Sequence, residues 1–301
     1  MLVLKNPKIA VPVVLFAGLV WSFGPLVVRY MDNPHLIPWQ YIFGRGLTIF
    51  ILLNLYLFFE EGKDFYKNYF KIGISGFIGG SGLGVAMISF MFSITNTSAA
   101  ITLLCLAAMP FFTALLAFLF LREIISLNVW ISIIIASIGI GIMAIGSGEQ
   151  NSLIGFIFGI TSSIGFSVFS VTLRWRKETP KFTTTAFAGL FCFVIAAIVI
   201  LSKDLVFFST SYNSSLFSLH GTLVCLGLIL YSIGSKAIPA AELTLLSLTE
   251  VIGGIFWVWL PLFGINEIPT TNTIIGGFFL FISLTYYSLV MRWNKRYIGL
   301  N

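Results

Sequence analysis

The chain has 301 residues, of which 58% are hydrophobic and 9% charged, and its mean hydropathy is +1.00. Soluble domains average about 45–50% apolar and about 25% charged residues. The composition therefore excludes a soluble enzyme with one membrane anchor, a disordered chain, a coiled coil and a secreted disulfide scaffold. The net charge of +6 is interpreted as membrane topology, not nucleic-acid binding, because the basic residues lie in short gaps between apolar runs.

Ten segments, in chain order, are long and apolar enough to cross a bilayer, which requires about 20 residues. The first is interpreted as a retained helix, since no small-x-small cleavage site ends it. A β-barrel is excluded because the apolar runs are continuous and do not alternate. We predict an all-α polytopic membrane protein with ten transmembrane helices, at 9–29, 38–59, 70–93, 98–120, 127–146, 153–173, 183–202, 216–235, 241–262 and 270–290.

The basic residues predict the orientation of these spans. With the N-terminus inside, fourteen Lys and Arg residues lie in inside segments, two lie in outside loops, and Arg45 lies within the second span. Basic residues are enriched on the cytoplasmic side of membrane proteins. The sequence therefore predicts a multi-pass protein of the inner (plasma) membrane with both termini in the cytoplasm.

The two halves of the chain match after a shift of 141 or 142 residues. Each half holds five predicted spans, an odd number, so the second half would enter the membrane upside down. We expect two inverted five-helix repeats, 1–147 and 148–301, in one membrane domain joined by the short link from Ser147 to Ser152. The matched sets are Gly18, Ser22, Gly24, Thr102, Leu103 and Glu123-Ile124 with Gly159, Ser163, Gly165, Thr244, Leu245 and Glu267-Ile268.

The fourth and ninth spans carry a family resemblance. Thr97-Ser98-Ala99-Ala100, Pro110-Phe111-Phe112 and Leu121-Arg122-Glu123 resemble the fourth span of the EamA family of the drug/metabolite transporter superfamily. The run from Ala241 to Ser247, followed by Glu250, Trp257 and Glu267, resembles its second copy, and Trp21 and Arg45 also fit the family. The resemblance implies a ten-helix inverted fold and export of small organic solutes such as amino acids.

One position departs from that family pattern. Ile252 stands where the first repeat has Pro110, the residue that would kink the fourth span. We expect Gly253-Gly254 to supply the bend in the ninth span instead, because glycine pairs also permit kinks.

Glu250 and Arg45 are the first two candidate site residues. Glu250 is predicted near mid-membrane, where a carboxyl group is costly and by default functional. It can exchange a proton, receive a substrate ammonium group, or stay a structural, hydrogen-bonded glutamate. Arg45 can bind a substrate carboxylate with two hydrogen bonds, pair with Glu250, or brace the halves through backbone carbonyls.

Three tryptophans could line a cavity and stack on an organic solute, namely Trp21, Trp257 and Trp259. Trp257 lies seven residues after Glu250, on the same helix face, whereas Trp259 is two residues further and cannot share it. We therefore expect Trp257 in the cavity and Trp259 against lipid or in helix packing.

Several polar residues within the spans complete the candidate set. Ser22, Ser163, Thr102 and Thr244 recur at equivalent repeat positions and either donate to substrate or hold helices together. Tyr231 is a weaker candidate. His220, placed near the outer edge of the eighth span, is either a pH sensor or incidental.

A secondary transporter is the predicted function, exporting amino acids or similar small metabolites by alternating access, with protons as a possible coupling ion. The alternatives are a facilitative, channel-like carrier for nucleotide-sugar-like or lipophilic solutes, and an intramembrane enzyme. An enzyme would need a catalytic cluster, which the sequence does not display. The expected partners are a small-molecule substrate and the lipid bilayer, with no cofactor, no metal and no nucleic acid, in a monomer or homodimer.

Overall fold

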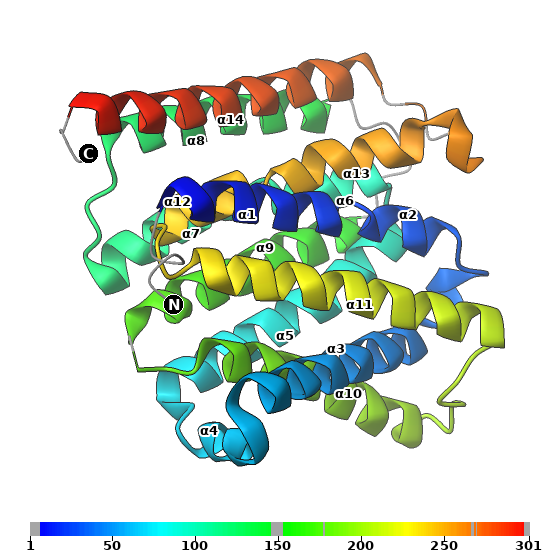
Figure 1. Cartoon of the computed structure of the whole chain (residues 1–301). Helices are drawn as coiled ribbons and strands as arrows, with labels where there is room; N and C mark the ends of the chain where they lie inside the picture. Colours follow the sequence, from blue (N-terminus) through cyan, green and yellow to red (C-terminus); the bar gives the residue numbers. More distant parts are fainter. Residues whose placement is uncertain (1–6, 146–152, 177, 266–267, 269, 298–301) are drawn as a thin grey trace.

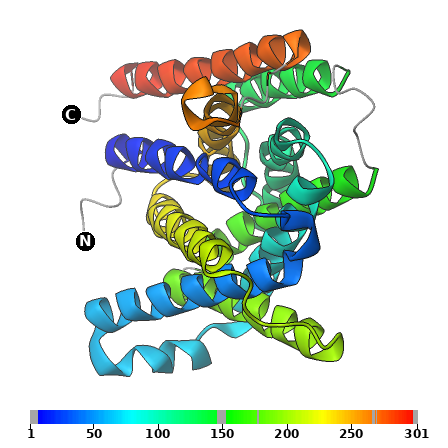
Figure 2. The ribbon, with the colours of Figure 1, turned by 90° about the vertical axis from the view of Figure 1, so that its right-hand side faces the viewer.

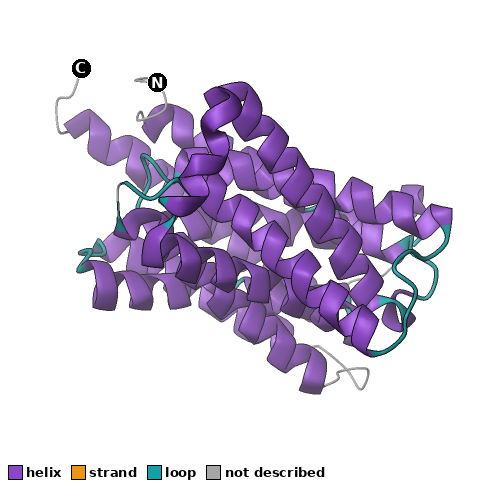
Figure 3. Ribbon diagram, turned by 90° about the horizontal axis from the view of Figure 1, so that it is seen from below, coloured by secondary structure: helices purple, strands orange, loops and turns teal. Residues whose placement is uncertain are grey.

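The computed structural model describes residues 7–145, 153–176, 178–265, 268 and 270–297. Within these ranges the regular elements are helices (Figures 1 and 3). The link from Ser147 to Ser152 and Glu267 lie outside the described residues. The α-helices are α1 (Pro7–Trp21), α2 (Gly24–Arg29), α3 (Pro38–Glu61), α4 (Lys67–Phe70), α5 (Gly73–Asn96), α6 (Ala99–Leu106), α7 (Met109–Leu116), α8 (Leu127–Ile145), α9 (Leu153–Trp175), α10 (Lys181–Ser202), α11 (Ser211–Gly234), α12 (Ala240–Leu246), α13 (Thr249–Trp259) and α14 (Thr271–Tyr297).

Short turns of other helix types complete the described chain. They are η2 (Pro34–Leu36), η3 (Gly62–Tyr66), η4 (Ala117–Leu121) and η5 (Pro261–Phe263). Among the described residues, eight helical segments are long and apolar enough to cross a membrane. Two further apolar helices, Leu127–Ile142 and Ile274–Tyr287, are shorter. The prediction of an all-helical, multi-pass membrane protein is therefore confirmed.

The long helices lie roughly side by side and form layers (Figure 1). Helices α8 and α14 pack together as an outer layer, and α3 and α10 lie at the opposite edge (Figures 1 and 2). The start of α1 and the end of α14 lie at the same end of the bundle, on the left of Figure 1. For the description below, this end is called the inner end and the opposite one the outer end, following the predicted orientation.

Helices from the two halves of the chain cross at small residues. Helix α5 packs against α9, and a Cβ atom added at Gly165 would lie 2.6 Å from the carbonyl oxygen of Gly82. Small residues let membrane helices approach closely. Their association then depends on van der Waals contacts, because the hydrophobic effect does not favour contact between two helices that are already surrounded by lipid. Gly82 is the middle glycine of the sequence Gly80-x-Gly82-x-Gly84, and it lies at the crossing of α5 and α9.

Three of the spans are broken near their middle. Helix α1 ends at Trp21 and α2 begins at Gly24, α6 and α7 are separated by Ala107 and Ala108, and α12 and α13 by Ser247 and Leu248. The last two breaks are equivalent under the 141-residue shift, because Ala107 corresponds to Leu248.

The bend in the ninth span was predicted at Gly253-Gly254, and this prediction is wrong. Both glycines lie inside α13, and the helix breaks at Ser247. The hydroxyl of Ser247 donates to the carbonyl of Thr244, 2.8 Å away, and that of Thr249 donates to Leu246, 3.1 Å away. Such back-bonding by Ser and Thr competes with the helical hydrogen bonds and bends helices, so no proline is needed.

Candidate functional site

A small central cavity lies between the two halves of the chain. Helices α1, α3, α5, α6, α7, α9, α11 and α13 contribute to its wall. The lining residues are Trp21, Arg45, Leu83, Ala86, Met87, Phe90, Leu106, Met109, Ser162, Phe166, His220, Val224, Leu228 and Glu250.

Arg45 lies in α3 and is 2% exposed. One guanidinium nitrogen, Nη2, donates to the carbonyl of Met87 in α5 at 2.6 Å, and Nη1 donates to the hydroxyl of Tyr41 at 3.2 Å. Its Nε atom is buried and has no partner among the described residues. A guanidinium stays charged and has five N–H donors, so these two contacts engage two of them, and the Nε donor is left without an acceptor in the described part of the chain.

Glu250 lies in the first turn of α13, halfway along the candidate span Ala240–Trp259. Glu250 lines the cavity, and no side chain among the described residues donates a hydrogen bond to its carboxyl group. It shares the cavity with Arg45 without an ion pair, since no nitrogen–oxygen distance between them is 4.0 Å or less. The cavity thus holds one acidic and one basic group that do not neutralise each other.

His220 is a cavity residue that the sequence analysis placed elsewhere. Helix α11 begins at Ser211, five residues before the predicted span start at 216, so His220 is nine residues into the helix. At 1.5 Å per residue that is about 14 Å, deep in the bundle. Its side chain is 3% exposed, and Nδ1 is hydrogen-bonded to the hydroxyl of Tyr41. Tyr41 precedes Arg45 by one helical turn, a spacing that could have drawn attention to it.

The tryptophans divide between the cavity and its surroundings. Trp21 lines the cavity, and its indole Nε1 donates to the carbonyl of Val224 at 3.2 Å. Trp257 is not among the cavity residues; it stacks on Phe23 with 4.7 Å between ring centroids and donates to Ser22 at 2.8 Å. Trp259 is 42% exposed on the bundle surface.

The serine and threonine pairs of the repeat make contacts between or within helices. Ser22 donates to the carbonyl of Leu19 at 2.6 Å, and Thr244 donates to that of Ala241 at 3.0 Å. The hydroxyl of Ser163 in α9 donates to a carbonyl at the end of α6. None of these three residues is among the described residues that line the cavity.

Thr102 and Tyr231 are likewise engaged away from the cavity wall. Thr102 and Ser93 share a hydrogen bond of 2.9 Å between their hydroxyls, and both are buried. Tyr231 is fully buried, shares a hydrogen bond of 2.7 Å with Ser170, and packs against the Trp21 ring at 5.5 Å. Tyr231 therefore supports a cavity residue from behind.

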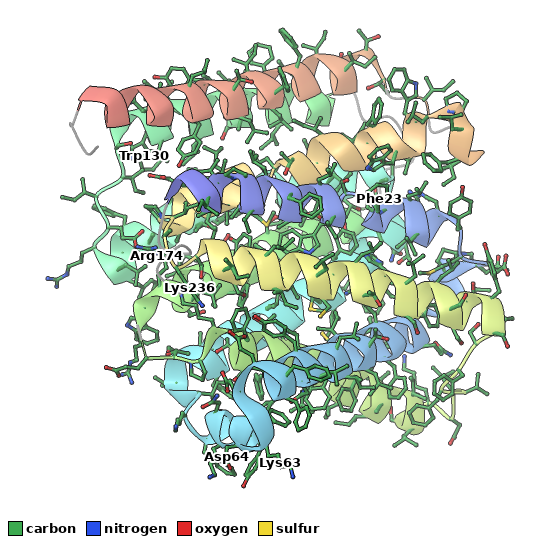
Figure 4. All side chains as sticks on the ribbon, in the orientation of Figure 1. Phe23, Lys63, Asp64, Trp130, Arg174 and Lys236 are labelled. Carbon is green, nitrogen blue, oxygen red and sulfur yellow. The ribbon has the colours of Figure 1, made fainter. Side chains whose placement is uncertain are left out.

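The inner end of the bundle, where Figure 4 labels Arg174, carries an ion pair between the two halves. Nε of Arg174, at the end of α9, lies 2.8 Å from a carboxylate oxygen of Glu123, which follows η4 in the first half. The Nη1 atom of Arg174 also donates to the carbonyls of Ser235 and Ile238, at 3.3 and 2.7 Å. One side chain thus links α9, the segment after η4 and the turn between α11 and α12.

The outer end carries a similar arrangement. Arg29, at the end of α2, donates to the carbonyl of Ile94 at 3.3 Å and to that of Thr97 at 3.5 Å. These acceptors precede α6, as Ser235 and Ile238 precede α12.

Comparisons with known proteins find relatives that are named as transporters. It is 25% identical over 259 residues to an "Uncharacterized transporter" of Helicobacter pylori strain J99, covering 82% of this chain and 84% of that protein. The corresponding protein of strain 26695 matches with the same identity and coverage. A solved crystal structure with 16% sequence identity superposes with a TM-score of 0.72, over 95% of this chain and 99% of that one, which shows a shared fold.

The family comparison agrees with these relatives. Residues 8–145 match the EamA-like transporter family. The match covers the segment that the sequence analysis identified as the first repeat, including the fourth-span residues on which the resemblance rests. The expected resemblance to the EamA family of the drug/metabolite transporter superfamily is therefore confirmed over residues 8–145.

Proposed function

We propose that this protein is a secondary transporter of the inner membrane that exports amino acids or similar small organic metabolites by alternating access. The observation that carries the proposal is the cavity in which Glu250 and Arg45 face a common space without pairing. A zwitterion offers an ammonium group to Glu250 and a carboxylate to Arg45, while the apolar wall accommodates its side chain. Charges left unpaired in a low-dielectric site bind complementary charges strongly.

Ten spans in two inverted repeats, 1–147 and 148–301, provide the proposed framework. The two arginine contacts support it. Adding 141 to the acceptors of Arg29, residues 94 and 97, gives the acceptors of Arg174, residues 235 and 238. The arginines themselves differ by 145, one helical turn more. Equivalent contacts at opposite ends of the bundle are what an upside-down second repeat produces. With ten spans, both termini lie in the cytoplasm.

Alternating access requires that each end of the cavity can close. We assign the closure of the inner end to Arg174 and Glu123, because this ion pair joins the two halves there. Opening the inner end separates the halves and therefore breaks the pair. Glu250 then either releases a proton or exchanges it for the substrate ammonium group, which couples transport to the proton gradient.

The proposal is tested by transport in proteoliposomes. Purified protein is reconstituted, and uptake of radiolabelled amino acids, polyamines, quaternary amines, organic acids and nucleosides is measured with and without a pH gradient. We expect saturable transport of an amino acid that shows counterflow and follows the pH gradient. In Glu250→Gln we expect the loss of both the transport and its dependence on the pH gradient. Asn54→Asp, in α3 but outside the cavity lining, is the control for an altered polar group in a span.

Three other outcomes of this transport assay would change the proposed function. Full pH-dependent transport by Glu250→Gln would remove the coupling role of this residue. Linear, unsaturable flux would favour the channel-like alternative. Transport limited to lipophilic solutes would agree with the largely apolar cavity wall and would replace amino acids as the substrate class.

A further inference from the structure

The hydroxyl group of Tyr41 is hydrogen-bonded to both Arg45 and His220 and therefore orients the two side chains. Arginine is always a donor, so the Tyr41 oxygen accepts from Nη1 of Arg45 at 3.2 Å. The hydroxyl proton of Tyr41 is then available for Nδ1 of His220, its other partner. We assign the tautomer in which Nδ1 accepts this proton and the imidazole proton resides on Nε2.

Two donors at the cavity are left without an acceptor. Nε of Arg45 is buried and has no partner among the described residues. Nε2 of His220 likewise has no hydrogen-bond partner in the described chain, and it faces Gly24, where an added Cβ would lie 2.6 Å away. Both side chains line the cavity and are nine-tenths or more buried. An unpaired buried donor costs free energy, which an incoming acceptor recovers.

Charge decides which kind of acceptor fits these two donors. The remaining wall around them includes the rings of Phe90 and Phe166 and the carboxyl group of Glu250. The centroid of the Phe90 ring lies 6.4 Å from that of His220, so the donors have an apolar neighbour, and Glu250 forms no hydrogen bond or ion pair with either of them among the described contacts. A carboxylate offers two acceptor oxygens and no proton of its own, which matches one cationic and one neutral donor.

We infer that His220 is a substrate-binding residue: with Arg45 it forms the subsite for the substrate's carboxylate, and Tyr41 is the positioning residue that holds both donors. Glu250 takes the ammonium group at a separate place in the same cavity. This inference rests on the proposed function, because it divides a zwitterion between the two charged ends of the proposed site.

The test compares two ligands that differ by the carboxylate alone. Dissociation constants of L-leucine and its decarboxylated analogue 3-methylbutylamine are measured by calorimetry on purified protein; L-phenylalanine and 2-phenylethylamine form a second pair. The variants are His220→Phe, which keeps a ring, His220→Gln, whose amide keeps a donor near Nε2, and Tyr41→Phe. His35→Gln, on the exposed turn η2, is the matched control.

We expect His220→Phe to weaken the amino acid by about 10- to 100-fold, the usual effect of losing a hydrogen bond to a charged group, and to leave the amine unchanged. Unchanged amine binding also shows that the variant is folded. His220→Gln and the His35 control stay close to wild type, and Tyr41→Phe shows a smaller loss for the amino acid alone, since both donors remain but lose their alignment.

The inference is overturned if His220→Phe binds the amino acid as wild type does, or if amino acid and amine weaken equally, which would make His220 a structural residue. These outcomes differ from a failure of the proposed function, in which the wild-type protein itself binds neither member of either pair. In that case the carboxylate subsite falls with the function on which it rests.

Discussion

Replacing Arg174 by alanine removes three contacts at the inner end of the bundle, one to Glu123 and two to backbone carbonyls. Hydrogen bonds to charged groups contribute about 1.5–3 kcal/mol when buried, and exposed ion pairs about 0.2–1 kcal/mol. The Arg174 and Glu123 side chains are 27% and 23% exposed, between these limits. We therefore expect about 1–2 kcal/mol less stability for the closed inner end, which is a factor of about 5–30 in its population.

The assay measures access to the cavity from the inner side. A single cysteine is placed at Met109, which lines the cavity at the start of α7, in a background without the three native cysteines. Reaction with a membrane-impermeant maleimide is followed in inside-out vesicles. Arg174→Ala should raise the labelling rate by about 5- to 30-fold. Lys236→Ala, a cation at the same end (Figure 4) that lies over the Phe182 ring, should leave the rate unchanged.

The double charge reversal sharpens this prediction. Glu123→Arg with Arg174→Glu restores the ion pair, but a glutamate cannot donate to the carbonyls of Ser235 and Ile238. We therefore expect the double variant to be labelled at a rate between that of the wild type and that of Arg174→Ala. Labelling of Arg174→Ala at the wild-type rate, in protein that keeps its melting temperature, would refute the assignment of an inner closure to this pair.

Three further variants test the packing by thermal shift and ligand binding. Ser163→Ala removes a side-chain donor from a carbonyl at the α6 break and should lower the melting temperature by about 2–4 °C, whereas Thr161→Val, whose hydroxyl bonds its own helix, should not. Equal effects would contradict the assigned role of Ser163. Gly165→Ala should lower the stability strongly, because its added Cβ meets the facing helix. At Gly277 an added Cβ meets nothing within 4 Å, so the stability of Gly277→Ala should match or exceed that of the wild type. A stable Gly165→Ala protein would be inconsistent with the close crossing. Trp257→Phe should keep ligand affinity, since this ring does not line the cavity; a tenfold loss would place it in the site.

The membrane class was predictable because hydropathy and charge are local properties of the chain. Eight candidate spans and two shorter apolar helices occupy the ten predicted segments. The edges were less predictable: α11 begins five residues before the expected start, and this shift carried His220 from an apparent edge position into the bundle. Hydropathy detects the apolar part of a helix, and the polar run from Ser211 to Ser215 concealed its first turn.

The composition of the cavity depends on contacts that no local pattern encodes. The sequence alone singled out Trp21, Arg45 and Glu250, because a charge or a large aromatic ring in an apolar span is visible without a structure. That Glu250 faces Arg45 without pairing, that Trp257 packs outside the cavity on Phe23, and that the ninth span breaks at Ser247 were decided by how distant helices cross. Periodicity places a side chain on a helix face, but only tertiary packing determines what that face meets.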